Sequence, residues 1–67
     1  MTDVTRLIDA LNRLAQDYPA VAELVKLRFF AGMTLGEAAD ALNLPRRTAD
    51  RNWVFARAWL ADALARG

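Results

Sequence analysis

The sequence predicts an all-α fold, a small four-helix domain that ends in a helix-turn-helix with a long second helix. Apolar residues recur at three- and four-residue steps along most of the chain, which is the period of amphipathic helices. The main break signals, Pro19, Gly32 and Asn43 with Pro45, divide the chain into four such segments. A chain of 67 residues has room for one hydrophobic core, so we expect residues 1–67 to form a single domain.

The first two segments are expected to form helices over about residues 4–17 and 20–31. Pro19 suits a first helical turn, and the apolar period of the second helix then runs to Phe30. Gly32 offers the left-handed conformation that ends many helices. The apolar face of the first helix consists of Val4, Leu7, Ile8, Leu11, Leu14 and Ala15.

The last two segments are expected to form helices over about residues 35–42 and 46–65. Thr34 and Glu37 have the spacing of a capping box, and Asn43 tolerates the left-handed conformation at the end of a short helix. Pro45 fixes the backbone angle where the long helix begins. Its predicted buried face consists of Ala49, Trp53, Ala56, Leu60, Ala63 and Leu64, and its opposite face carries Arg47, Asp50, Arg51, Val54 and Ala58.

The composition excludes several classes of protein. The chain has no Cys, no His and no Ser, so disulfides, Cys/His metal sites and the usual nucleophile-base pairs lack their residues, and we expect no enzyme, no metal and no cofactor. No apolar stretch approaches the ~20 residues of a membrane span, and we expect a cytoplasmic protein without a membrane or small-molecule partner. Hydrophobic residues nevertheless make up 55% of the chain, which hints at an apolar surface for a protein partner.

Charge is divided unevenly along the chain. Residues 1–42 carry four basic and six acidic side chains, whereas residues 43–67 carry five basic and two acidic ones. Arg46, Arg47 and Arg51 fall in the first two turns of the last helix, where a helix-turn-helix reaches phosphates and base edges in the major groove. The charge pattern therefore favours DNA binding through this helix.

Three further residues bear on this hypothesis. Asp50 would repel phosphate unless it accepts a hydrogen bond from a cytosine or pairs with Arg46 or Arg47, and the sequence leaves both roles open. Thr34 is most simply a helix cap, with a phosphate contact as a second role. Trp53 is expected in the core rather than as a stacking platform, and the roles of Phe55 and Trp59 are left open.

Three stretches of the sequence resemble a known family. They are LRFFAGMTLGEAA at residues 27–39, ALNLPRRTA at residues 41–49 and RNWVFARAWL at residues 51–60. Together they resemble region 4 of bacterial sigma-70-family factors, and the extracytoplasmic-function (ECF) group is the most similar. Asn43 stands where the family usually has Gly, Ala49 where it has a larger aliphatic residue, and Asp50 where a basic or polar residue is common.

The resemblance implies a four-helix domain that binds the minus-35 promoter element through its last helix, the recognition helix, and docks on the RNA polymerase beta flap. It also implies that anti-sigma factors compete for these surfaces. Carried over by position, Arg46, Arg47 and Thr48 contact phosphate, whereas Asp50, Arg51 and Val54 face bases. For the flap or an anti-sigma helix we expect a groove on the first two helices, with candidates Leu7, Leu11, Leu24 and Leu27, of which one or two stay partly exposed.

Two other classes of function fit the same pattern. A response-regulator effector domain shares the order of short helix, turn and long helix, but it would dimerise on a palindromic site. A protein-interaction module would use the apolar excess for a partner helix, and its arginines would only confer solubility. We favour the DNA-binding domain of a sigma factor, cut from a longer chain.

Overall fold

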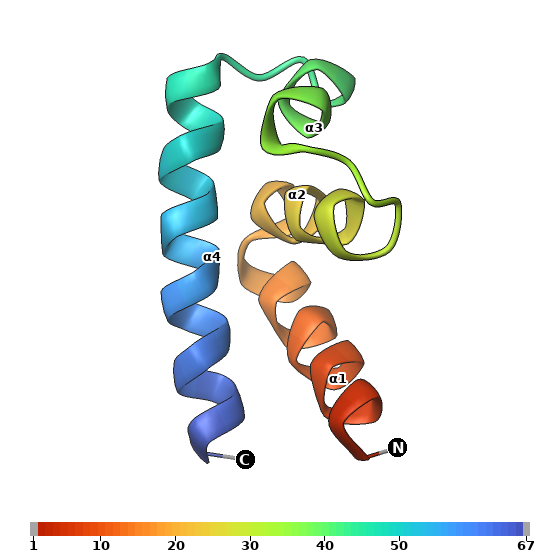
Figure 1. Ribbon diagram of the computed structural model, residues 1–67. Helices are drawn as coiled ribbons and strands as arrows, with labels where there is room; N and C mark the ends of the chain where they lie inside the picture. Colours follow the sequence, from red (N-terminus) through yellow and green to blue (C-terminus); the bar gives the residue numbers. More distant parts are fainter. Residues whose placement is uncertain (1, 67) are drawn as a thin grey trace.

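The computed structural model describes the backbone of residues 2–66 and the side chains of residues 4–66, and this range forms four helices and no strand (Figure 1). The helices are α1 (Thr2–Asp17), α2 (Pro19–Phe29), α3 (Leu35–Ala41) and α4 (Arg46–Arg66). The predicted all-α class is therefore confirmed, and each helix begins and ends within two residues of its expected position.

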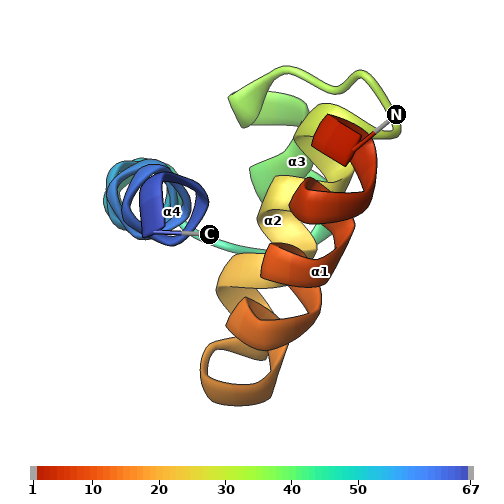
Figure 2. The ribbon, with the colours of Figure 1, turned by 90° about the horizontal axis from the view of Figure 1, so that it is seen from below.

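The long helix α4 forms one side of the molecule, and the other three helices pack against it (Figures 1 and 2). Its 21 residues give a length of roughly 30 Å at the standard rise, close to the 32 Å long axis of the whole molecule. The start of α1 and the end of α4 lie at the same end, where Arg6 donates a hydrogen bond to the carbonyl of Leu64. The turn between α3 and α4 lies at the opposite end.

The main core lies where α1, α2 and the second half of α4 meet. Leu11, Leu14 and Val25 are fully enclosed there, and α4 contributes Ala56 and Leu60. Truncating one such leucine to Ala typically costs about 2–5 kcal/mol, so this cluster is what holds α4 on the bundle. The predicted buried face of α4 is confirmed, because Ala49, Ala56 and Leu60 are buried and the other three members are half-buried.

The contact between α3 and α4 is built from small side chains. Ala38 and Ala39 are the buried residues of α3, and Ala49 is the buried residue in the first turns of α4. Methyl side chains let the two helix backbones approach closely but interlock little. This contact therefore sets the spacing of the two helices more firmly than the rotation of α4 about its axis.

The turn between α3 and α4 closes as the sequence predicts. Asn43 adopts a left-handed backbone with φ of 58°. Its N–H donates to the Asp40 carbonyl at 3.1 Å, and the Leu44 N–H donates to the Ala39 carbonyl at 2.8 Å. These two bonds form a Schellman motif, which satisfies the last carbonyls of α3. Asn thus performs the part that Gly usually plays in this turn.

Two sequence expectations about apolar faces are wrong. Phe30, placed on the buried face of the second helix, is 58% exposed because α2 ends at Phe29 and Phe30 is already the C-cap residue. Val4 and Ile8 of α1 are exposed as well, because the apolar stripe of that helix is wider than the surface that α2 and α4 cover.

Candidate nucleic-acid interface

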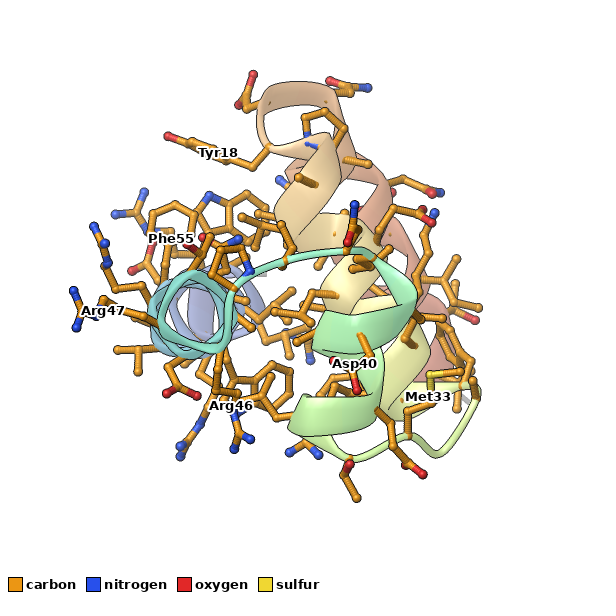
Figure 3. All side chains as sticks on the ribbon, turned by 90° about the horizontal axis from the view of Figure 1, so that it is seen from above. Tyr18, Met33, Asp40, Arg46, Arg47 and Phe55 are labelled. Carbon is orange, nitrogen blue, oxygen red and sulfur yellow. The ribbon has the colours of Figure 1, made fainter. Side chains whose placement is uncertain are left out.

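The basic end of α4, which consists of Arg46, Arg47 and Arg51, lies on the surface beside the α3–α4 turn. All three side chains are exposed, and Arg47 points away from α2 and α3 (Figure 3). Their position follows from the local sequence, because Pro45 precedes the first helical residue and Ala49 turns the opposite side of the helix into the protein. The basic end therefore faces solvent over the first two turns of α4.

Arg46 is held in place by two neighbours. Its Nε lies 3.3 Å from Oδ1 of Asp50, one turn further along α4. A Cβ atom added to Gly36 of α3 would come within 3.2 Å of Nη1 of Arg46, so the glycine leaves room for the guanidinium. Of the two sequence alternatives for Asp50, the structure contains the local ion pair, and the partner is Arg46 rather than Arg47.

Arg47 and Arg51 differ from Arg46 in having no ion-pair partner among residues 4–66. The carboxylate of Asp50 is engaged with Arg46, so the two remaining guanidinium groups carry uncompensated positive charge on the exposed face. A guanidinium in this state can bind a phosphate or take guanine O6 and N7 in a bidentate pair. The charge available for DNA is thus concentrated on Arg47 and Arg51.

The other predicted contact residues surround the basic end. Val54 is 66% exposed one turn beyond Asp50, and Thr48 is half-buried. Thr34 forms the predicted capping box, because its Oγ1 accepts from the Glu37 N–H at 3.1 Å and its own N–H donates to the Glu37 carboxylate at 2.8 Å. The hydroxyl hydrogen of Thr34 can still be donated to an anion, since capping uses only the oxygen as acceptor.

The aromatic residues of α4 pack against α2 and the chain that leads into it. Phe55 meets Tyr18 edge to face, with ring centroids 4.8 Å apart, and Figure 3 shows the two rings side by side. Trp53 is half-buried and contacts Arg28 and Phe29. Trp59 is half-buried and packs against the main core. The expected structural role of Trp53 is confirmed, and Phe55 and Trp59 also serve packing.

An apolar groove of about 520 Å³ runs beside α4. It is lined by Leu7 of α1, Phe29 of α2 and, along α4, Val54, Ala58, Ala61 and Leu64, with Arg57 as its charged member. Sequence reasoning did not single out Phe29, Ala61 or Arg57 for such a surface. The signal was available, since residues 54, 58 and 61 recur at helical spacing on the face that was expected to be exposed.

The four leucines predicted to meet a protein partner divide into two pairs. Leu11 is 2% exposed and Leu24 is fully buried, so this conformation has no place for a partner on either. They are core residues because α1 and α2 pack on each other and on α4 along that stripe. Leu7 and Leu27 are half-buried, and of these Leu7 lines the groove beside α4.

Two further searches limit the kinds of site. No three acidic side chains gather closely enough to hold a metal ion in the part of the chain that the structure describes. No helix within residues 2–66 has the length and hydropathy needed to cross a membrane.

Comparison with known families decides between the classes of helix-turn-helix protein. The family model of the ECF sigma factor matches residues 1–66, nearly the whole chain. The chain belongs to the ECF sigma factor family. No curated protein and no solved structure matches the chain significantly. As an ECF sigma factor it acts in transcription initiation with RNA polymerase and promoter DNA, it binds DNA and it is not an enzyme. The family match favours this assignment over a response-regulator effector domain.

Proposed function

We propose that this ECF sigma factor chain is the region that recognises the minus-35 promoter element, with α4 as the recognition helix. The observation that carries the proposal is the exposed basic end of α4, supported from behind by α3 through a close-packed alanine contact. In a helix-turn-helix the N-terminal residues of the second helix contact base edges in the major groove. Here those residues are the ones with uncompensated charge.

Within this interface the contacts divide by position. Arg46, Arg47 and Thr48 lie in the first turn of α4 and are assigned to phosphates, with Thr34 as a further phosphate donor. Asp50, Arg51 and Val54 lie in the second and third turns and face the bases. Because the Asp50 carboxylate already pairs with Arg46, its main effect in this assignment is to hold the Arg46 guanidinium near the duplex.

Binding to DNA is tested by selecting a duplex from a random library with the 67-residue chain and titrating that duplex across salt concentrations. Three or four phosphate contacts should give a slope of log K against log salt of roughly −3 to −4. A scrambled duplex should bind more weakly with a similar slope. A flat salt response, or equal affinity for both duplexes, would contradict the assignment.

We further propose that the groove beside α4 receives the polymerase beta flap. The groove is apolar, exposes part of Leu7 and is large enough for several side chains of a partner helix. Ala61 is exposed within it, whereas Ala65 is equally exposed on the same helix and does not line it. Ala61→Glu should therefore abolish flap binding, and Ala65→Glu should leave flap binding intact. Both variants should keep the wild-type thermal midpoint, since neither residue is in the core.

An anti-sigma factor competing for the same groove should lose affinity for Ala61→Glu in parallel with the flap. Wild-type flap binding by Ala61→Glu would place the docking surface elsewhere on the domain.

A further inference from the structure

The end of α2 grips Trp53 of α4 from two directions. The guanidinium carbon of Arg28 lies 4.5 Å from the centroid of the Trp53 ring, and the Phe29 ring meets Trp53 edge to face at 5.8 Å with an interplanar angle of 80°. The Nη1 of Arg28 also donates to the carbonyl of Met33 at 3.3 Å. Arg28 thus connects α2, the loop that leads into α3, and the recognition helix.

We infer that Arg28 is a positioning residue, which acts through Trp53 to fix the rotation of α4 about its axis and so to aim the basic end at DNA. The inference rests on the proposed DNA-binding function. Arg28 is half-buried and belongs to α2, whereas the assigned DNA contacts lie on α4 and at the start of α3. Any effect of Arg28 on DNA binding is therefore expected to pass through α4.

The fold needs such a device because of the alanine contact described above. Ala38, Ala39 and Ala49 bring α3 and α4 together without large side chains that interlock. With side chains reaching about 5–6 Å from a helix axis, a rotation of about 10° displaces their tips by about 1 Å. Recognition sites tolerate errors of about 0.5 Å and 10–20°, so a rotation of this size matters. Trp53 is the large side chain of α4 nearest to the basic end that contacts another helix.

The surroundings of Arg28 argue against a role in stability alone. Its Nε is buried without a hydrogen-bond acceptor among residues 4–66, an arrangement that disfavours folding. An apolar side chain of similar length would avoid this cost and still cover the Trp53 ring. The guanidinium gains instead an electrostatic attraction to the ring face, which is directional and strongest where water is excluded. The arginine therefore adds orientation at the expense of stability.

The test compares Arg28→Met with Arg13→Met, a control that removes an exposed arginine of α1 paired with Asp9 at 3.8 Å. Arg28→Met should bind the selected duplex about five- to thirtyfold more weakly, the range expected for loss of a partly buried cation–π contact. The salt slope should stay unchanged, because no phosphate contact is lost, and the thermal midpoint should shift by less than about 4 °C. Arg28→Lys, which keeps a cation over Trp53, should restore binding to within about threefold of wild type.

Several outcomes would overturn the inference. Wild-type affinity in Arg28→Met shows that α4 is aimed without Arg28. A weaker affinity with a salt slope reduced by about 0.9 shows that Arg28 contacts phosphate itself. If Arg28→Met does not fold, Arg28→Gln, which keeps a donor for Met33 but no charge, takes its place and should show the same loss. Wild-type affinity in Arg28→Gln then overturns the inference.

A measurement without DNA separates this inference from the proposed function. The backbone amide NMR signals of residues 46–53 should shift in Arg28→Met and not in Arg13→Met, since only the first variant lets α4 rotate. Unchanged signals overturn the positioning role whatever the DNA result. Absence of duplex binding by the wild-type chain, with the signals shifting as expected, overturns the proposed function and leaves the positioning of α4 by Arg28 supported.

Discussion

Replacing Asp50 by Asn tests the electrostatics of the proposed interface. The substitution removes the carboxylate that holds Arg46 at 3.3 Å and leaves a side chain of nearly the same shape. It removes one negative charge from the DNA-facing surface and frees one guanidinium. If the freed Arg46 gains one phosphate contact, the slope of log K against log salt becomes steeper by about 0.9.

The size of the effect depends on the salt concentration. One additional released counterion raises affinity about eightfold at 0.1 M salt relative to 1 M, and about fourfold at 0.2 M. The stability change should be small, because both side chains of the pair are more than half exposed, at 65% and 56%. Exposed pairs of this spacing contribute about 0.3–0.5 kcal/mol, which corresponds to a thermal midpoint change of about 2–4 °C at most.

The chain supplies a matched control at the other end of the same helix. Asp62 pairs with Arg66 at 3.2 Å with the same four-residue spacing and similar exposure. Asp62→Asn therefore changes the net charge and breaks an equivalent ion pair far from the basic end. Fluorescence anisotropy with the selected duplex between 0.05 and 0.5 M salt, on the order of the range where counterion release dominates, should show the gain for Asp50→Asn alone.

Two results would refute this reasoning. Equal gains in both variants would mean that only net charge matters, and that the Arg46–Asp50 pair has no local role. A loss of affinity in Asp50→Asn of about 1–3 kcal/mol, confined to one base position, would mean that Asp50 reads a cytosine when DNA is bound.

Three further predictions concern single side chains. Arg47→Ala should weaken all duplexes alike and reduce the salt slope by about 0.9, whereas Arg51→Ala should cost about 1–3 kcal/mol at one base position, as measured on a panel of single-base variants. Equal losses of Arg51→Ala on every site would remove its base-reading role. Asn43→Ala should lower the free energy of unfolding by about 1–2 kcal/mol because Ala disfavours a left-handed backbone, and Asn43→Gly should be close to neutral in the same chemical denaturation assay. Thr34→Ala should cost about 0.5–2 kcal/mol through loss of the cap, with a midpoint about 4–8 °C lower for each kcal/mol in thermal unfolding.

The local features of the fold were readable from the sequence because each depends on a few adjacent residues. The capping box at Thr34 and the left-handed turn at Asn43 are of this kind, and both have the predicted geometry. Periodicity also identified the buried face of α4. It could not give the width of the apolar stripe that neighbours cover, because coverage depends on where other helices lie. Val4, Ile8 and Phe30 are exposed for that reason.

The candidate site shows the same division. Arg46, Arg47 and Arg51 could be grouped from spacing on one helix, and the structure places all three on the exposed face. The contact of Arg28 with Trp53 joins residues 25 positions apart and has no local signature in the sequence. The choice of Arg46 over Arg47 as the partner of Asp50 likewise required coordinates, since both spacings are compatible with a helical ion pair.

The two ends of the described chain lie together, about the full 32 Å long axis away from the turn between α3 and α4. Anything tethered to either end is therefore held away from the basic end and does not cover it. A flexible tether would need roughly 30 residues before its root-mean-square length matched that distance. A shorter tether keeps an attached group close to the groove end of α4 at high effective concentration and gives it little access to the duplex. The fold thus separates by distance what is joined to the chain from what the chain contacts on DNA.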